Sequence, residues 1–307
     1  MKEDKLSIIK QVIWLRLAQI AINKKYKNKE FSIPIHLAMG HESIAVAVDS
    51  AMSVDDSLFL THRNIHYNLA RLRNLKPVLD EYCLQETGLV GGRLGSMNLT
   101  NSGKGVFYAS SILGNNLSVG SGFALGNKVI NKNGVVFVVT GDGGIEEGSF
   151  YENILFLTSN NLPSVIIIEN NNWSLATRIN ERRANIDLNM LAKSIGLEYF
   201  SLSGNDPFKY IETIRSIRSK SLANNSPVLV EVELTTLGYW YLTNEENPNG
   251  KFVNYHAGPA PHIEDKKYPI IESSIGDPLA ALKNHLDINQ LTSISEDLLI
   301  EIDKEIS

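Results

Sequence analysis

The sequence predicts an α/β protein with a doubly wound, mostly parallel sheet flanked by helices. Continuous apolar runs of strand length stand at 135–140, 165–168 and 228–232. Such runs are typical of strands that are buried on both faces of a parallel sheet. Helical patterns separate the runs, and strand, helix and strand in succession form parallel βαβ units. We therefore expect a single α/β domain over residues 1–307.

The first hundred residues are predicted to be mostly helical. Apolar residues recur at helical spacing over about 4–24 and again over 40–52. A shorter helix is expected over 76–85, because Pro77 stands in its first turn. A glycine-dense loop follows at 88–95, and its backbone can approach a ligand closely because few side chains intervene.

The rest of the chain alternates between the two element types. Helices are expected over 149–159 and around 207–223, between the buried strands. The region 241–268 is rich in Asn, Pro and Gly, which predicts a long surface loop. The tail after Pro278 is predicted to be helical.

Composition and charge exclude several classes of function. The 307 residues carry 29 Lys+Arg against 34 Asp+Glu, so bulk charge recruits neither nucleic acid nor an anionic membrane. The single cysteine, Cys83, excludes an internal disulfide and favours a reducing compartment. The N-terminus lacks a signal-peptide pattern, and no apolar stretch reaches the roughly 18 residues of a membrane span. We expect a soluble cytoplasmic protein that binds anions only through a local site.

Polar side chains follow two of the predicted strands at the point where each strand ends. Asp142 follows the first run, and the sequence Glu-Asn-Asn-Asn at 169–172 follows the second. In open parallel sheets, ligands bind outside the carboxyl ends of the strands. Oxygen ligands on such a scaffold suit Mg²⁺, which commonly shares its shell with phosphate oxygens. Gly143 and Gly144 leave backbone N–H groups free at a predicted helix N-terminus, which favours a diphosphate.

A lone Gly-Asp-Gly is usually only a turn that ends a strand. Here Asn171 follows Asp142 by 29 residues, directly after the next strand. That combination favours a magnesium–diphosphate site over a simple turn.

The pattern from Gly141 to Trp173 resembles the thiamine-diphosphate signature, a GDG followed by NN after just under 30 residues. The whole span of about 33–173 is similar to the alpha subunit of two-chain 2-oxo acid dehydrogenase E1 components of the pyruvate or acetoin dehydrogenase type. The matching pieces are His36-Leu-Ala-Met-Gly-His-Glu42, Thr61-His-Arg63, Glu86-Thr-Gly88, Gly92-Arg-Leu-Gly-Ser-Met97 and Ser111-Ile-Leu-Gly114.

The resemblance implies a role for several residues in cofactor binding. Asp142 and Asn171 would bind Mg²⁺ through side-chain oxygens, and Trp173 through its backbone carbonyl. Arg63 would pair with the diphosphate, a use that suits its planar multi-donor group. Ser111 and Leu113 would hold the aminopyrimidine, with Leu113 as the apolar wedge that bends thiamine diphosphate.

The resemblance also implies a partner and a reaction. The glutamate that activates the cofactor would come from a beta-type subunit with a pyrimidine domain, in an α2β2 heterotetramer. The expected reaction forms an acyl-carbanion intermediate from a 2-oxo acid. His36 matches an active-site position and is a candidate proton donor, whereas His41 is expected to be structural. The helix around 117–125 contains small residues and is either a partner interface or an ordinary buried helix.

Some residues depart from the E1 pattern. His62 stands where a tyrosine usually precedes the diphosphate arginine, and its imidazole could still reach a phosphate oxygen. The stretch 235–240 lacks the usual arginine and histidine cluster. The segments 113–125 and 255–260 are instead similar to transketolases, and His256 is hypothesised to return a histidine to the site. An alternative function is therefore a two-chain carboligase or transketolase-like transferase that passes an acyl or ketol unit to an aldehyde or sugar. A third possibility is a cofactor-binding scaffold without activity.

Overall fold

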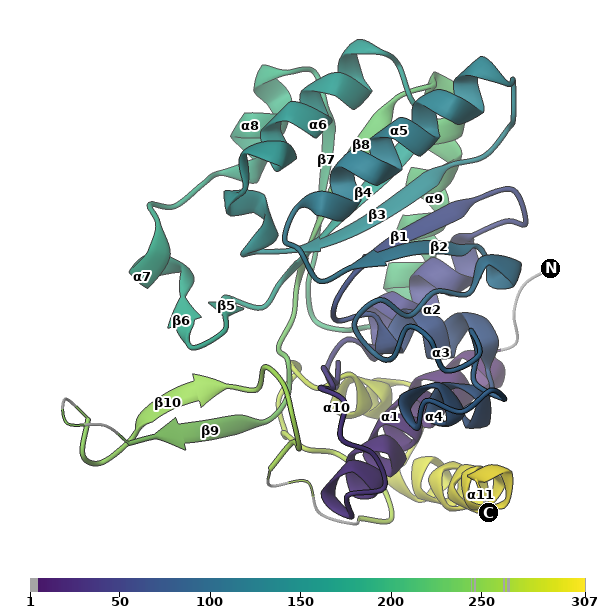
Figure 1. Ribbon diagram of the computed structural model, residues 1–307, viewed down its shortest axis with the longest axis vertical. Helices are drawn as coiled ribbons and strands as arrows, with labels where there is room; N and C mark the ends of the chain where they lie inside the picture. Colours follow the sequence, from purple (N-terminus) through teal and green to yellow (C-terminus); the bar gives the residue numbers. More distant parts are fainter. Residues whose placement is uncertain (1–4, 244, 246, 262, 264–265, 307) are drawn as a thin grey trace.

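The computed structural model describes residues 5–243, 245, 247–261, 263 and 266–306. Its centre is a six-stranded sheet in the order β2-β1-β3-β4-β8-β7, in which every neighbouring pair is parallel (Figure 1). The strands are β1 (Ser57–Thr61), β2 (Val106–Ser110), β3 (Val136–Gly141), β4 (Ser164–Asn170), β7 (Glu198–Leu202) and β8 (Pro227–Glu233). The predicted α/β class and parallel sheet are confirmed.

Helices cover both faces of this sheet. The α-helices of the described residues are α1 (Lys5–Lys27), α2 (Glu42–Ala51), α3 (Ile65–Leu72), α4 (Lys76–Tyr82), α5 (Asn115–Val129), α6 (Gly148–Ser159), α7 (Ile179–Arg182), α8 (Leu188–Ser194), α9 (Pro207–Asn224), α10 (Pro278–Ala281) and α11 (Ile288–Ile306), of which α7, α10 and α11 lie away from the sheet. Within the described residues, no helix is both long and apolar enough to cross a membrane.

Alternate residues of each central strand point to opposite faces of the sheet. On β3, Val136 and Val138 join the apolar core that includes residues of α5, α6 and α8. Phe137 and Val139 join the larger core that includes residues of α1, α2 and α9. All four side chains are fully buried. Burial on both faces is the physical reason why β3 has no polar alternation, as the sequence indicated.

The C-terminal third differs from the sequence-based expectation at one place. The region 241–268, expected to be a long loop, contains strand β10 (Lys251–Asn254), which pairs antiparallel with β9 (Tyr239–Leu242). Tyr239 stacks on Phe252 across the hairpin with ring centroids 5.4 Å apart. These aromatic cross-strand contacts stabilise the hairpin. The sequence-based prediction missed it because the region between the strands is rich in Asn, Pro and Gly. Figure 1 shows that the hairpin extends away from the parallel sheet.

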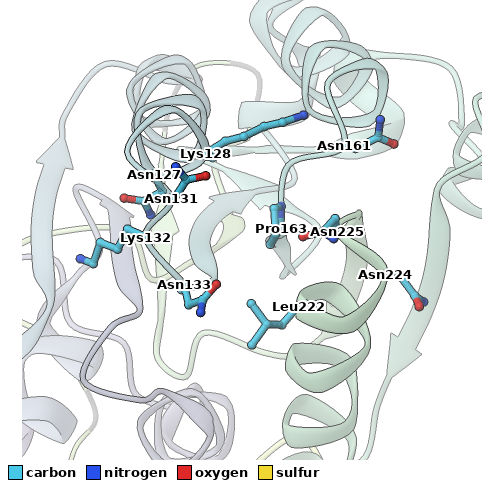
Figure 2. Close-up of a pocket in the computed structure, with 12 residues that line it drawn as sticks. Asn127, Lys128, Asn131, Lys132, Asn133, Asn161, Pro163, Leu222, Asn224 and Asn225 are labelled. Carbon is cyan, nitrogen blue, oxygen red and sulfur yellow. The ribbon is translucent and has the colours of Figure 1, made fainter.

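Three helices end at the amino-terminal edge of the sheet with an asparagine in the left-handed conformation. These are Asn131 after α5, Asn161 after α6 and Asn225 after α9, with φ between 49° and 54°. In each case the next N–H donates back to a helix carbonyl, as from Lys132 to the Asn127 carbonyl at 2.9 Å. This is the Schellman arrangement that ends helices. A cavity of about 520 Å³ lies between these ends, and its asparagine-rich lining (Figure 2) follows from helix termination.

The glycine-dense loop at 88–95 is organised by one buried carboxylate, that of Glu81 in α4. Its oxygens accept hydrogen bonds from the N–H groups of Val90, Gly92, Leu94 and Gly95, at 2.7–3.2 Å. Burial alone raises the pKa of Glu81, but these four bonds outweigh it and hold the pKa below its usual value. The loop therefore keeps its shape through an ionised side chain.

We expect Glu81→Gln to lower the free energy of unfolding at pH 7 by about 2–4 kcal/mol, because buried N–H groups lose their charged acceptor. The difference from the wild type is present above the ordinary carboxyl pKa and disappears as pH falls through the lowered pKa of Glu81. Urea unfolding between pH 3 and pH 7 measures it. The matched control is Glu86→Gln, because Glu86 is exposed in the same region. Equal losses in both variants at pH 7 would contradict this account.

Candidate functional site

The carboxyl ends of β3 and β4 finish level with each other. Their parallel register pairs Gly141 with Glu169, so the residues that follow both strands leave the sheet at one edge. A small cavity of about 60 Å³ lies there, with room for roughly two water molecules. It is lined by His41, Thr61, His62, Arg63, Leu113, Gly141, Asp142, Gly143, Gly144, Glu169, Asn171, Trp173, Ser174 and His256.

Asp142 presents a buried carboxylate to this cavity. Its side chain is 3% exposed, and Oδ2 accepts a hydrogen bond of 2.8 Å from Nη2 of Arg182. Burial raises the pKa of Asp142, and the pairing with Arg182 opposes that rise. The same guanidinium also pairs with Glu146 at 3.0 Å. The position in front of Asp142 therefore accommodates positive charge.

Asn171 is the residue of the asparagine run whose side chain lines the cavity together with Asp142. Its Nδ2 donates to Oγ1 of Thr236 at 2.8 Å, while its Oδ1 accepts from the N–H of Trp173 at 2.9 Å. Asn172 has φ of 63°, in the left-handed region, and turns the chain just beyond β4. The carboxylate and the amide thus belong to one cavity, which a shared metal ion requires.

The two glycines after Asp142 are required by packing. A Cβ on Gly143 would lie 2.7 Å from Oγ of Ser174, and one on Gly144 would lie 2.2 Å from Oγ1 of Thr140. Gly144 begins a 3₁₀ turn, Gly144–Glu146, and α6 starts only at Gly148. A side chain at either position would therefore displace its neighbour, Ser174 or Thr140.

Arg63 is a buried cation that lines the same cavity. It donates to the backbone carbonyls of Leu37 and His256, the second at 3.0 Å. Burial lowers the pKa of Arg63, and the nearby acidic groups of Tyr255, Glu169 and Asp142 counteract the shift. The two carbonyls fix the guanidinium between the segment before α2 and the segment after β10.

Three histidines from distant segments meet beside Arg63. The ring centroids of His36 and His62 are 4.7 Å apart, and His256 lies 5.2 Å from the first and 5.7 Å from the second. Burial, reinforced by the charge of Arg63, lowers the pKa to about 2 for His36, about 3 for His62 and about 4 for His256. The lowered pKa values keep the imidazoles neutral at pH 7, and Nδ1 of His36 is buried without a hydrogen-bond partner among the described residues. The positive charge of Arg63 also opposes a metal ion among them.

The two residues expected at the aminopyrimidine lie on the loop between β2 and α5. Leu113 lines the cavity and is 41% exposed. Ser111 is exposed and is not among the residues that line the cavity. This side of the site is open to the surface of the chain.

Two interactions of the site had no signal in the sequence motifs. Arg182 belongs to the short helix α7, 40 residues beyond Asp142. Glu169 is 5% exposed, accepts hydrogen bonds of 3.0 Å from Nε2 of His66 and from the hydroxyl of Tyr67, and lies 3.2 Å from Nδ1 of His41. Burial alone raises the pKa of Glu169, but contact with both histidines holds it well below its usual range. The expectation that His41 is buried within the fold agrees with its 1% exposure.

Comparison with known proteins defines the class of this chain. The profile of the family described as dehydrogenase E1 component matches residues 10–237. The chain belongs to that family, and it is an E1 subunit of the alpha type, as the sequence motifs predicted. The segment that carries β10 and His256 lies beyond the matched residues.

Curated relatives include the pyruvate dehydrogenase E1 component subunit alpha of Rickettsia bellii, 28% identical over 232 residues that cover 76% of this chain and 71% of the relative. The mitochondrial counterpart from Dictyostelium discoideum is 24% identical over 292 residues, 92% of this chain and 75% of the relative.

Solved structures with the same fold include the transketolase of Campylobacter jejuni, with a TM-score of 0.57 and 15% identity. Another is an R356L mutant transketolase of Pichia stipitis, with a TM-score of 0.59 and 15% identity. The alignments cover 98% and 97% of this chain but only 49% and 45% of those chains. They establish the fold alone, and this chain spans about half the length of these transketolases.

Proposed function

We propose that this chain binds thiamine diphosphate through Mg²⁺ and, with a beta-type partner, decarboxylates a 2-oxo acid. The observation that carries the proposal is the shared cavity of Asp142, Asn171 and Arg63 in a chain of the dehydrogenase E1 component family. The names of the relatives favour pyruvate as the 2-oxo acid.

The donor set fits magnesium. Asp142 and Asn171 offer side-chain oxygens, and Trp173 offers a backbone carbonyl at the same edge of the sheet. Hard oxygen ligands leave the remaining octahedral positions for phosphate and water. The guanidinium of Arg182 lies 2.8 Å from Asp142, so a metal ion at this carboxylate would replace one positive charge by another.

The neighbouring groups fit a diphosphate and a proton-transfer role. Arg63 provides charge, neutral His62 provides a hydrogen bond, and the backbone of Gly143 and Gly144 can approach closely because both residues lack side chains. When bound, thiamine diphosphate supplies the carbon nucleophile and electron sink for decarboxylation. The negative diphosphate would raise the depressed pKa values of His36 and His256 and so suit them to hold protons.

An exposed apolar face suits the partner subunit. Helices α5 and α6 lie side by side on the sheet (Figure 1). Their outward residues and the adjoining loop expose Ile112, Leu113, Val119, Leu125, Val129, Ile130, Tyr151 and Leu155. We call this the α5–α6 face. A contiguous apolar surface of this kind is typical of an interface.

Helix α5, which the sequence offered as either an interface or a buried helix, has one buried face and one exposed face. Leu117, Gly120 and Ala124 face the core, whereas Val119 and Gly122 face outward. A Cβ on Gly122 would meet nothing within 4 Å, which leaves room for close approach by a second subunit. Because Leu113 belongs to both this face and the cavity, a beta-type subunit seated here would also close the cofactor site. We propose an α2β2 assembly on this basis.

A transketolase-like transfer to an aldehyde or sugar is the second candidate. The meeting of His36, His62 and His256 favours it, because neutral imidazoles suit the hydroxyl and carbonyl groups of a sugar. Acyl transfer to a lipoylated domain, compared with transfer to an aldehyde, separates the two functions in the same preparation.

The proposed function is tested by producing the chain together with a beta-type E1 subunit from the same organism and measuring pyruvate-dependent release of carbon dioxide. Activity should require both chains, thiamine diphosphate and Mg²⁺, and Asp142→Ala should reduce it at least about 100-fold through loss of the cofactor. A chain that binds no thiamine diphosphate by calorimetry, with or without the partner, would overturn the proposal.

Arg182→Gln should tighten Mn²⁺ binding, used as a probe of the magnesium site, by roughly 10-fold, because the cation no longer competes with a guanidinium for Asp142. Electron paramagnetic resonance in the presence of thiamine diphosphate measures free Mn²⁺. Arg183→Gln is the matched control, since Arg183 pairs with Glu146 rather than Asp142. Unchanged affinity in Arg182→Gln means that this guanidinium does not compete with the metal.

Val119→Arg should weaken assembly with the beta-type subunit by at least about 10-fold, because a charge would be buried at the centre of the α5–α6 face. The control is Val54→Arg, the same change at a valine that is 94% exposed elsewhere. Analytical ultracentrifugation of the two-chain mixture gives the result. Equal assembly by both variants would mean that the beta-type subunit binds another surface of the chain.

A further inference from the structure

A chain of polar contacts connects the buried carboxylate of Glu169 to the amide of Asn171. Oε2 of Glu169 lies 3.2 Å from Nδ1 of His41, and Nε2 of His41 lies 2.8 Å from Oγ1 of Thr236. Oγ1 of Thr236 in turn accepts the hydrogen bond of 2.8 Å from Nδ2 of Asn171. Glu169, His41 and Thr236 are all at most 5% exposed, so water does not compete along this path.

The orientation of the amide follows from its two partners: the backbone N–H of Trp173 can only donate, so it bonds to Oδ1 of Asn171 and leaves Nδ2 to donate to Thr236. Nδ1 of His41 faces the carboxylate of Glu169 at 3.2 Å but makes no hydrogen bond within the described residues, so we place the ring proton on Nδ1, beside the acceptor. Nε2 is then an acceptor and takes the hydroxyl proton of Thr236, which lies 2.8 Å away. The oxygen of Thr236 is left to accept, and it accepts from Asn171.

This direction determines which end of the amide faces the cavity. The NH₂ group of Asn171 is held by Thr236, so Oδ1 remains on the side of the proposed metal site. Oδ1 accepts one hydrogen bond from Trp173, and a carbonyl oxygen has a second lone pair for a cation. An amide that is rotated by half a turn occupies nearly the same volume, but it would point its NH₂ group, which carries a partial positive charge, at the cation.

The backbone fixes the distance between His41 and Thr236. The N–H of Leu237 donates to the carbonyl of Met39 at 2.7 Å, which joins the two loops beside the contact. Gly40 has φ of 100°, and a Cβ there would lie 1.9 Å from the carbonyl oxygen of Thr235. Only glycine permits this approach, so the contact between the two loops depends on Gly40.

We propose that Thr236, supported by His41 and Glu169, is a positioning residue that orients the amide oxygen of Asn171 toward the metal ion. The inference rests on the proposed function, because it assigns Asn171 to Mg²⁺. Thr236 does not contact the reacting atoms and acts only through Asn171. It gives a role to Thr236 in the stretch where the E1 pattern has an arginine and histidine cluster.

The test measures Mn²⁺ affinity of the full chain in the presence of thiamine diphosphate by electron paramagnetic resonance. Thr236→Val removes the hydroxyl at nearly constant volume and should weaken Mn²⁺ binding about 10-fold or more, the effect expected when a residue that orients a metal ligand is lost. Thr236→Ser restores the hydroxyl and should bind within about 3-fold of the wild type. Thr235→Val, the same change one residue earlier, is the matched control and should leave the affinity unchanged.

Thermal unfolding of each variant separates orientation from folding. Should Thr236→Val fail to fold, Thr236→Ala gives the same loss of the hydroxyl with less steric demand. Wild-type affinity in a folded Val or Ala variant, or equal weakening by Thr235→Val, would overturn the positioning role while leaving the proposed function intact. Absence of Mn²⁺ binding by the wild type, both alone and with the beta-type subunit, would instead overturn the proposed function, and the positioning role with it.

Discussion

The site depends on the parallel register between β3 and β4. Because Gly141 pairs with Glu169, the next residues of both strands leave the sheet at the same height and edge. Parallel strands align their carboxyl ends, so this register alone brings together loops that are distant in the sequence. A slip of one residue would exchange the side chains of β3 between the two cores that they fill and separate Asp142 from Asn171. The full burial of Val136, Phe137, Val138 and Val139 opposes that slip.

The second constraint is the carboxylate that β4 carries into the interior. An ionised Glu169 is tolerated there only because His41, His66 and Tyr67 surround it. Those groups come from the start of α2 and from α3, so the segments that carry His36 and Arg63 are drawn to the same edge of the sheet. A stability requirement of the core thus brings together the groups that could serve the cofactor. The cost of burying the charge is offset by hydrogen bonds that also place neighbouring residues.

Sequence reasoning succeeded where a single strand determined the outcome. The apolar runs of β3, β4 and β8 predicted buried parallel strands, and Asp142 with Asn171 could be placed because each directly follows such a strand. The interior strand β1 was missed within the stretch predicted to be mostly helical. The edge strands β2 and β7 were missed as well, because exposed Phe107 and Glu198 interrupt their apolar character. Arg182 and Thr236 could not be found either, since their partners lie 40 and 65 residues away and no local pattern records the contact.

The ion pair between Asp142 and Arg182 would connect the fold with the affinity of the proposed cofactor site. The carboxylate is already paired in this structure, so the proposed metal ion would have to replace the guanidinium of Arg182. The exchange lowers the net affinity by the free energy of the lost pair, yet it spares the fold an isolated buried carboxylate. Arg182 also bonds to Glu146 and to the carbonyl of Thr177, so it has other partners when Asp142 is taken. Arg182 could therefore give up its contact with Asp142 and still keep two hydrogen-bond acceptors.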